Sequence, residues 1–237
     1  MGAPAEITTL DDPAAAAADR LAAAVDAGGH IALAGGSTPR AAYERLATMD
    51  VDWAACTLWF GDERCVGPDD ERSNFGMVRA ALLDRLQGRR PDVRRIAGEL
   101  GPEAAADDYE RELREVFGAG LPRFDLILLG LGPDAHCASL FPGQPSLDER
   151  ERLALGIERP GLAPWVPRVT LTLPVINGAR DVVFLATGHD KAAAVARTFA
   201  GEPDRDAPAS LVAPASGVLT VLIDPPAGER LPADVAR

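Results

Sequence analysis

Short apolar runs alternate along the chain with stretches in which apolar side chains recur at helical spacing. Such runs, bounded by turn residues, are typical of buried strands, and the longer periodicity is typical of amphipathic helices. The predicted strands are Ile31–Ala34, Thr57–Phe60, Leu126–Leu129, Val169–Leu173, Val182–Ala186 and Val218–Ile223. The predicted helices run from Pro13 to about Ala27, from the loop 35–39 to about Met49, from Phe75 to Leu86, from Pro102 to Phe117 and from Asp190 to Phe199.

Local signals define the ends and the buried faces of three of these helices. Asp12 is suited to cap the first helix and Pro13 to occupy its first position, and Gly28-Gly29 ends it. Asp190 is expected to cap the last helix. The side chains predicted to face inward are Ala14, Ala18, Leu21 and Val25 in the first helix, Tyr109, Leu113, Val116 and Phe117 in the fourth, and Ala192, Val195, Ala196 and Phe199 in the last.

Strands that alternate with helices predict an α/β fold with a mainly parallel, Rossmann-like sheet and helices on both faces. Loops that follow parallel strands meet at one edge of the sheet, where ligands bind. Four loops are expected there: 35–39, 61–64, 130–136 and 187–191. Residues 1–237 are predicted to form one domain, with an irregular excursion near 142–167 that is rich in Pro, Gly and charge.

The charge balance limits the class of partner. The 237 residues include 24 basic and 36 acidic side chains, a net charge of −12, which disfavours nucleic acid and anionic membranes but leaves a small anionic substrate open. The sequence has no apolar run near the ~20 residues that cross a bilayer and no secretory signal pattern, so a cytoplasmic protein is expected. Its three cysteines and three histidines lack zinc-site spacing, so no metal site or disulfide is predicted.

Lys191 is the only lysine among the 24 basic residues. In a chain that otherwise uses arginine, a single lysine indicates a position that needs the compact ammonium group. The alternative is that Lys191 occurs by chance on a solvated face. Lys191 falls in the first turn of a predicted helix, where the helix dipole disfavours a cation by up to ~1 kcal/mol. An anion bound between the helix end and Lys191 would explain this placement, and neutralisation by Asp190 is the simpler alternative.

The loop at 35–39 has the composition of an anion-binding turn. Gly35 and Gly36 allow a ligand to approach the backbone, and Ser37 or Thr38 can bind a phosphate oxygen at the start of a helix. The loop matches neither the dinucleotide fingerprint nor the P-loop, since no GKS or GKT follows it. A tight turn with a helix cap is the alternative interpretation.

His136 is the strongest candidate for a general base. It lies in the loop GLGPDAHC after the most apolar strand, and Asp134 is near enough to orient its ring. A histidine that only makes local hydrogen bonds is the alternative. His30 lies before a strand, at the other edge, and His189 has no glycine-lined approach.

Asp62, Glu63 and Arg64 form a charged cluster after a predicted strand. Arg64 is suited to bind phosphate through both arms of its guanidinium, and Asp62 to accept hydrogen bonds from sugar hydroxyls. A glycosidase pair of carboxylates is disfavoured because adjacent loop residues need not point together. No GxSxG motif is present, and Ser139 and Ser210 have no evident base, so covalent catalysis has little support.

Five ordered blocks carry a resemblance to a known family. They are LAGGSTPRAAYERL at 33–46, WFGDERCVGPDDERSNFGM at 59–77, FDLILLGLGPDAHCASLFPG at 124–143, PRVTLTLPVIN at 167–177 and ATGHDKAAAV at 186–195. The chain resembles the 6-phosphogluconolactonases, within the glucosamine-6-phosphate isomerase/deaminase-like fold. The resemblance implies hydrolysis of 6-phospho-D-glucono-1,5-lactone in the oxidative pentose phosphate pathway, without a metal or organic cofactor.

The resemblance also implies roles for single residues. His136 would activate the water that attacks C1, and Asp134 would hold or polarise the site. The loop 35–39, Lys191 and Arg64 would take the 6-phosphate and nearby oxygens, with Arg168 added if its strand runs antiparallel. The implied partner is a small phosphorylated sugar lactone, and the protein is expected to be a monomer or weak homodimer.

The histidine loop departs from the family pattern GxDGHTASLFP at two positions. Ala135 replaces a glycine and Cys137 replaces a threonine. If position 135 needs a positive φ, alanine costs roughly 1 kcal/mol or shifts the loop. A favoured thiolate at Cys137 would make the loop sensitive to oxidation.

Two alternative functions follow from these observations. A non-catalytic sugar-phosphate binder is compatible with the altered histidine loop. A sugar-phosphate isomerase or deaminase of the same fold is disfavoured, because such deaminases carry an acidic residue soon after the histidine, where this chain has SLFP at 139–142.

Overall fold

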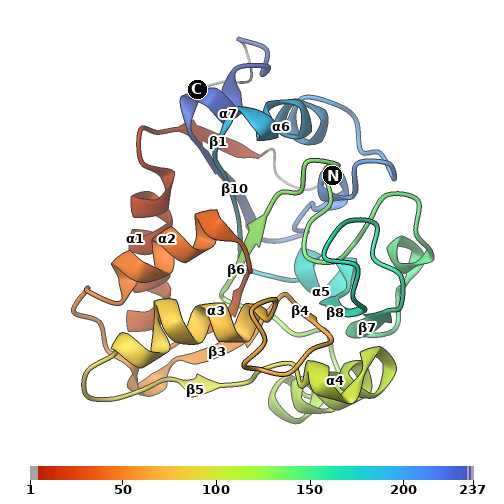
Figure 1. Cartoon of the computed structure of the whole chain (residues 1–237). Coiled ribbons are helices and arrows are strands. Elements are labelled where there is room, and N and C mark those ends of the chain that lie inside the picture. Colours follow the sequence, from red (N-terminus) through yellow and green to blue (C-terminus); the bar gives the residue numbers. More distant parts are fainter. Residues whose placement is uncertain (1–4, 234, 236–237) are drawn as a thin grey trace.

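Seven parallel strands form the large sheet of this computed structural model, which describes residues 5–233 and 235 (Figure 1). Every strand pair in the sheet is parallel, as the sequence predicts for an α/β fold. In spatial order the strands are β1 (Glu6–Thr9), β10 (Val218–Ile223), β9 (Asp181–Ala186), β6 (Leu126–Gly130), β2 (His30–Leu33), β3 (Thr57–Phe60) and β5 (Asp92–Val93).

A second, antiparallel sheet corrects three predictions. It consists of β4 (Asp62–Arg64), β8 (Arg168–Leu171) and β7 (Ala154–Ile157). The prediction of a loop at 61–64 is therefore wrong for β4, and the stretch 142–167, expected to be irregular, contains β7. The strand predicted at Val169–Leu173 ends at Leu171 and lies outside the parallel sheet, because its partners are β4 and β7.

The helices cover both faces of the large sheet. Figure 1 shows α1 and α2 on one side of it, and α5 with the small sheet on the other. The helices are α1 (Pro13–Asp26), α2 (Ser37–Leu46), α3 (Asn74–Ala81), α4 (Pro102–Phe117), α5 (Leu173–Asn177), α6 (Ala192–Phe199) and α7 (Pro225–Gly228). Short 3₁₀ turns occupy η1 (Trp53–Ala55), η2 (Leu83–Arg85), η3 (Gly98–Leu100), η4 (Pro145–Asp148), η5 (His189–Lys191) and η6 (Pro208–Leu211). Between residues 5 and 233, no helix combines the length and the apolarity that a membrane crossing requires.

The helix ends agree with the sequence only in part. Asp12 caps α1 by accepting a hydrogen bond from the backbone N–H of Ala15 at 3.1 Å, and the predicted face of α1 is buried. The prediction that Asp190 caps the last helix is wrong, since His189–Lys191 form η5 and α6 begins after it without a side-chain cap. In α4, Phe117 packs against the core as predicted, whereas Val116, predicted to face inward with it, is 39% exposed.

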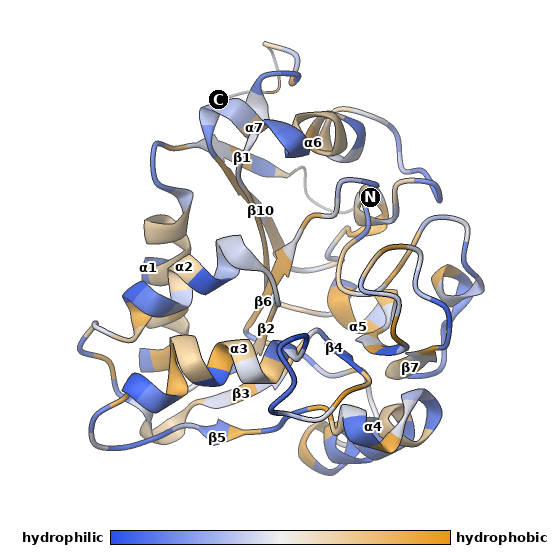
Figure 2. Cartoon of the chain, viewed as in Figure 1, coloured by the Kyte–Doolittle hydropathy of each residue, from blue (hydrophilic) through white to orange (hydrophobic). Residues whose placement is uncertain are grey.

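Two buried tyrosines anchor the carboxyl ends of neighbouring strands. The Tyr43 hydroxyl accepts from the N–H of Ala34 at 2.9 Å and donates to its carbonyl at 2.8 Å. The Tyr109 hydroxyl makes the same two bonds with Phe60, both at 2.9 Å. Figure 2 shows the apolar strands of the large sheet at the centre of the molecule, where such backbone groups have no access to water.

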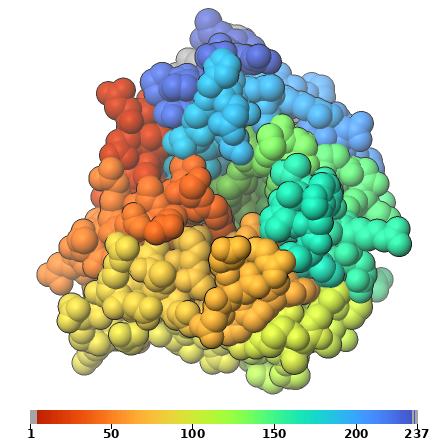
Figure 3. All heavy atoms as spheres, in the orientation of Figure 1, coloured from red at the N-terminus to blue at the C-terminus, as the bar shows by residue number. Residues whose placement is uncertain are grey.

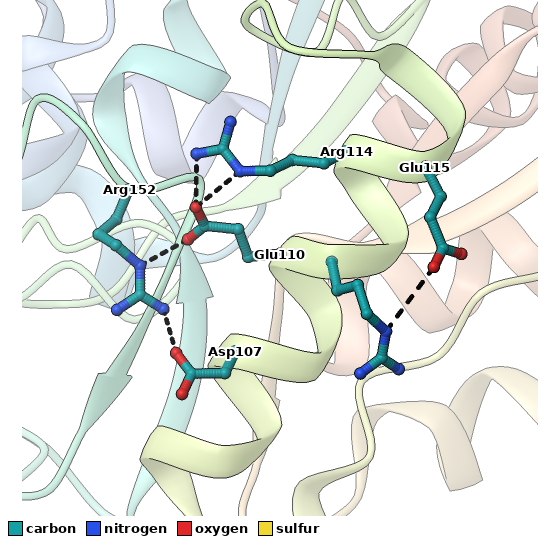
Figure 4. Close-up of a pocket in the computed structure, with 6 residues that line it drawn as sticks. Asp107, Glu110, Arg114, Glu115 and Arg152 are labelled. Atoms are coloured by element: carbon teal, nitrogen blue, oxygen red, sulfur yellow. Dashed lines mark hydrogen bonds and ion pairs between the residues drawn. The ribbon is translucent and has the colours of Figure 1, made fainter.

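An ion-pair cluster joins α4 to the small sheet. Glu110, whose side chain is 11% exposed, accepts hydrogen bonds from Arg114 and, across 42 residues of sequence, from Arg152, each at 2.6 Å. Arg152 lies just before β7 and also contacts Asp107 (Figure 4). Burial opposes the charged form of Glu110, but the hydrogen bonds from Arg152 and Arg114 outweigh it and lower the pKa of this carboxyl. The cluster therefore stabilises the packing of the small sheet against α4.

We expect Glu110→Gln to lower the free energy of unfolding by about 1–3 kcal/mol at neutral pH, because two arginines lose their buried partner. The folded pKa of Glu110 is below its unfolded value, so this stabilisation is complete above the unfolded pKa of ~4.3 and is lost as the pH falls through the folded pKa. Urea unfolding of both proteins at pH 7 and below pH 4 measures the difference and its decline.

Glu115→Gln is the matched control on the same helix. Glu115 is 62% exposed and lies 3.7 Å from Arg111, so its loss is expected to cost less than about 0.5 kcal/mol. An equal effect of the two substitutions, or a Glu110 effect that grows in acid, would contradict the assignment.

Candidate active site

A hollow of about 260 Å³ lies at the carboxyl edge of the large sheet, where β2, β6 and β9 end. Figure 3 shows it between the orange, green and teal segments of the chain. Nine of the ten predicted site residues line it: Gly35, Gly36, Ser37, Thr38, Asp62, Arg64, His136, Arg168 and Lys191. The tenth, Asp134, contacts His136 directly. Four segments that are distant in sequence therefore meet as predicted.

His136 and Asp134 form the closest polar pair in this hollow. The Nδ1 atom of His136 lies 2.5 Å from the Oδ1 atom of Asp134, which also accepts from the His136 backbone N–H at 3.3 Å. Burial disfavours the charged carboxyl, but the bond to His136 outweighs this and lowers the pKa of Asp134. An ionised carboxylate can only accept, so Nδ1 carries the hydrogen, and in the neutral imidazole the lone pair is then on Nε2. His136 is thus prepared to accept a proton.

The other histidines lie elsewhere. His30 is at the start of β2, at the opposite edge, where its Nδ1 atom accepts from the Trp59 indole at 3.3 Å. His189 is exposed and pairs with Glu229 at 2.7 Å. Neither lines the hollow.

The backbone of the histidine loop is held in an unusual conformation. Ala135 has φ 65° and Ala138 has φ 48°, both in the left-handed region that favours glycine. The expectation that position 135 can require a positive φ is confirmed, and alanine occupies it with the His136–Asp134 pair still formed. Gly132 lies beneath the ring, where a Cβ atom would come within 2.0 Å of His136 Nδ1.

Cys137 does not have the properties of a reactive thiol. It is buried, and burial together with the charge of Asp62 raises its pKa to about 12. The structure therefore contradicts the hypothesis of a favoured thiolate at this position.

Asp62 is buried within a polar network that the sequence does not indicate. Its Oδ2 atom accepts from the Ser139 hydroxyl at 2.7 Å, and its Oδ1 atom from the Asn74 amide at 3.0 Å. Asn74 lines the hollow and packs against Gly35, where a Cβ atom would come within 1.9 Å of its amide oxygen. The contacts of Asn74 and Ser139 with Asp62 are not predicted from the sequence, because these residues are remote from it along the chain.

Glu63 faces away from this network and holds the start of α3. Its carboxylate accepts from the backbone N–H of Arg64, Asn74 and Phe75, each at 2.7 Å, and from the Ser73 hydroxyl at 3.0 Å. Burial raises the pKa of Glu63 despite these bonds. Because its oxygens are occupied by backbone donors, Glu63 and Asp62 do not form a glycosidase pair.

Arg64 and Arg168 lie opposite each other in the antiparallel pairing of β4 and β8. The condition for Arg168 to reach the site, an antiparallel strand, is therefore met. Arg168 is 3% exposed, stacks on the Phe141 ring at 5.3 Å and donates to the carbonyls of Leu162 and Pro164. Within the part of the chain that the structure describes, neither arginine has a carboxylate within 4.0 Å. Although the carboxylate of Asp62 lines the same hollow, two guanidinium groups without a direct ion pair favour an anion there.

The loop 35–39 presents free backbone donors to the same hollow. Gly36 precedes α2 with φ 106°, and no side chain accepts from the first N–H groups of this helix. This favours the anion-binding interpretation over a capped turn. Thr38 Oγ1 lies 2.9 Å from Thr187 Oγ1, so the loop is tied to the segment after β9.

Lys191 is the third cation that lines the hollow, with Arg64 and Arg168. Its side chain is 23% exposed, and its Nζ atom lies 3.6 Å from Asp190, which is largely exposed. Such a long, solvated contact neutralises little of the charge. Across residues 5–233, no group of three or more His, Cys, Asp or Glu side chains is arranged to hold a metal ion.

Comparisons with known proteins identify the family of the chain. The family model of glucosamine-6-phosphate isomerases/6-phosphogluconolactonase matches residues 7–221. A curated 6-phosphogluconolactonase of Homo sapiens is 45% identical over 179 residues, which are 75% of this chain and 69% of the human protein. That of Synechocystis sp. is 42% identical over 208 residues, 86% of this chain and 85% of the relative. The structure of 6-phosphogluconolactonase from Trypanosoma cruzi has a TM-score of 0.85 at 30% identity and covers 98% of each chain.

We expect Gly132→Ala to break the His136–Asp134 pair, since the new methyl group would occupy the position of the imidazole ring. In proton NMR spectra, the hydrogen-bonded Nδ1–H resonance of His136 should be present in the natural protein and absent in the variant. Gly130→Ala is the control, because a Cβ atom there would meet only Gly35 O at 3.9 Å. An unchanged resonance in Gly132→Ala would contradict the geometry.

Cys137 is expected to resist alkylation by iodoacetamide in the folded protein, because it is buried and protonated at neutral pH. Cys65, which is half-buried, is the internal comparison and should react sooner. Peptide mass spectrometry before and after denaturation measures both rates. Rapid labelling of Cys137 in the folded state would restore the hypothesis of a redox-sensitive loop.

Proposed function

Because the chain belongs to the family of glucosamine-6-phosphate isomerases and 6-phosphogluconolactonases, we propose that it hydrolyses 6-phospho-D-glucono-1,5-lactone to 6-phospho-D-gluconate. The observation that carries the proposal is the His136–Asp134 pair in a hollow that three cations line. The pair supplies a base and the cations supply an anion site. Both belong to the chemistry of a phosphorylated lactone.

His136 acts as the general base in this proposal. Asp134 holds the imidazole in the tautomer with hydrogen on Nδ1, which leaves Nε2 to take a proton from water. When Nε2 becomes protonated, the nearby carboxylate stabilises the imidazolium. The low pKa of Asp134 keeps this carboxylate charged.

The 6-phosphate and the ring oxygens are bound by the cationic part of the hollow. The backbone of Gly35 and Gly36, the hydroxyls of Ser37 and Thr38, and the Lys191 and Arg64 side chains provide donors. Arg168 adds a second guanidinium, fixed by two carbonyls and an aromatic ring. Binding energy from the phosphate orients C1 toward His136.

The reaction needs one proton acceptor that later becomes a donor. Water attacks the C1 carbonyl while its proton passes to His136 Nε2. The tetrahedral intermediate collapses, the bond between C1 and the ring oxygen breaks, and the proton on Nε2 moves to that oxygen. The new carboxyl group then releases a proton to solvent. No covalent enzyme intermediate is required.

Two alternatives receive less support. A sugar-phosphate deaminase of this fold would need an acidic side chain soon after the histidine, where residues 139–142 are SLFP. A non-catalytic binder would tolerate a displaced histidine, whereas His136 keeps its pair with Asp134 although Ala135 replaces the usual glycine.

The proposal also covers the domain organisation, compartment, oligomeric state and pathway of the protein. The whole chain acts as one domain in the cytoplasm, as a monomer or weak homodimer, within the pentose phosphate pathway. A shared hydrophobic core that extends from Ile7 to Ala227 supports one domain. The net charge of −12 disfavours nucleic acid and anionic membranes as partners.

We expect the natural protein to hydrolyse freshly generated 6-phosphogluconolactone. Proton release measures the reaction, at mildly acidic pH, where spontaneous hydrolysis is slow. His136→Ala should lower kcat by at least ~100-fold, because it removes the general base. His30→Gln, at the opposite edge of the sheet, should retain activity within about threefold.

Three outcomes would overturn parts of the proposal. No turnover with tight binding of 6-phosphogluconate would favour the non-catalytic binder. Full activity in His136→Ala would remove the base from the mechanism but not the reaction. Release of ammonia from glucosamine 6-phosphate would favour the deaminase.

A further inference from the structure

Asp224 holds the backbone at the start of the turn that carries Lys191. Both oxygens of its carboxylate accept from the N–H of Gly188, each at 3.0 Å. Its Oδ1 atom also accepts from the N–H of Ala227 at 2.9 Å and so caps α7. Asp224 does not line the hollow, and no motif in the sequence points to it.

Gly188 decides the direction in which the chain enters this turn. It has φ 98°, a conformation that side chains rarely adopt, and η5 begins immediately after it. The turn closes when the N–H of Lys191 donates to the carbonyl of Gly188 at 3.0 Å. The position of Lys191 in the hollow therefore depends on how Gly188 is held.

Strand register places Asp224 next to Gly188. Ile223, the last residue of β10, pairs with Ala186, the last residue of β9, so the segments after both strands leave the sheet side by side. On the other side of this segment, Thr187 contacts Thr38 of the loop 35–39 at 2.9 Å. The Lys191 turn is thus held between the phosphate loop and Asp224.

We propose that Asp224 is a positioning residue for the proposed reaction, which sets the affinity for the substrate phosphate by holding the Gly188–Lys191 turn. The inference rests on the proposed function, in which Lys191 binds that phosphate. A charge-assisted, two-oxygen hydrogen bond to a single N–H restricts this backbone more than a neutral bond does. The second tie between these elements, His189 to Glu229, is exposed and contributes less.

The experiment compares Asp224→Ala with the natural protein. The expected result is a rise of about tenfold in KM for 6-phosphogluconolactone and in Ki for inorganic phosphate, while kcat stays within about twofold. A rise in KM without a change in kcat means that the lost interaction had stabilised the bound substrate and the transition state equally. A purely structural role would instead reduce the folded fraction and leave KM unchanged.

Two further variants distinguish the hydrogen bonds of Asp224 to Gly188 from its cap of α7. Asp224→Asn keeps an oxygen at the Oδ1 position for both N–H groups but loses the charge and the second acceptor for Gly188, so it should raise KM by less than Asp224→Ala does. Asp224→Ser keeps a good helix cap but is too short to reach Gly188, so it should fold normally and still raise KM.

Asp12→Ala is the matched control. Asp12 caps α1 by accepting from the N–H three residues ahead, as Asp224 does for α7, but its other partner is Arg45 rather than Gly188. Asp12→Ala should lower thermal stability to a similar degree and leave KM and Ki unchanged.

Lys191→Met distinguishes failure of this inference from failure of the function on which it rests. If Lys191→Met raises KM and Asp224→Ala and Asp224→Ser do not, Asp224 is not a positioning residue. If Lys191→Met leaves KM unchanged, the phosphate assignment itself is wrong, and the lactonase assay still decides the reaction. Equal losses in Asp224→Ala and Asp12→Ala would also overturn the inference.

Discussion

Parallel hydrogen bonding between β2, β6 and β9 is the constraint on which the site depends. The pairs Ile31 with Leu126 and Gly130 with Leu185 fix three strands in one direction. Because the strands are parallel, the segments that follow them all leave at one edge. That edge brings the loop 35–39, the histidine loop and the Lys191 turn together in one hollow. Burial of the apolar strands on both faces makes the arrangement stable.

The small sheet completes the hollow and carries most of its buried charge. A carboxylate or guanidinium removed from water is costly unless hydrogen bonds replace its hydration. Asp62 receives those bonds from Ser139 and Asn74, and Arg168 gives its own to two carbonyls. Since Ser139 lies three residues after His136, the same bond fastens the histidine loop to β4. The hydrogen bonds that satisfy the buried charge of Asp62 therefore also hold the loop that carries His136.

The histidine loop keeps its geometry against a local cost. A left-handed alanine is disfavoured by roughly 1–2 kcal/mol, and this loop has two, Ala135 and Ala138. The surrounding bonds oppose relaxation, since Gly132 N–H donates to His136 O and Ala209 N–H donates to Ala135 O, each at 2.9 Å. Strain that persists in this way is common where a side chain must be held for chemistry. The packing that holds the ring, with Phe141 at 4.7 Å, also limits its motion.

The sequence by itself determined the parallel α/β class, the main strands and the loops that meet at the site, because periodicity and helix-end signals act over a few residues. It also singled out His136 and Asp134 by their position after the most apolar strand, and Lys191 as the only lysine in the chain. Only the tertiary structure decided that β4, β7 and β8 form a separate antiparallel sheet, since strand partners are a matter of pairing across the fold. The same holds for the contacts of Asn74 and Asp224. Their hydrogen bonds join residues that are 12 and 36 positions apart, a distance over which local patterns carry no information.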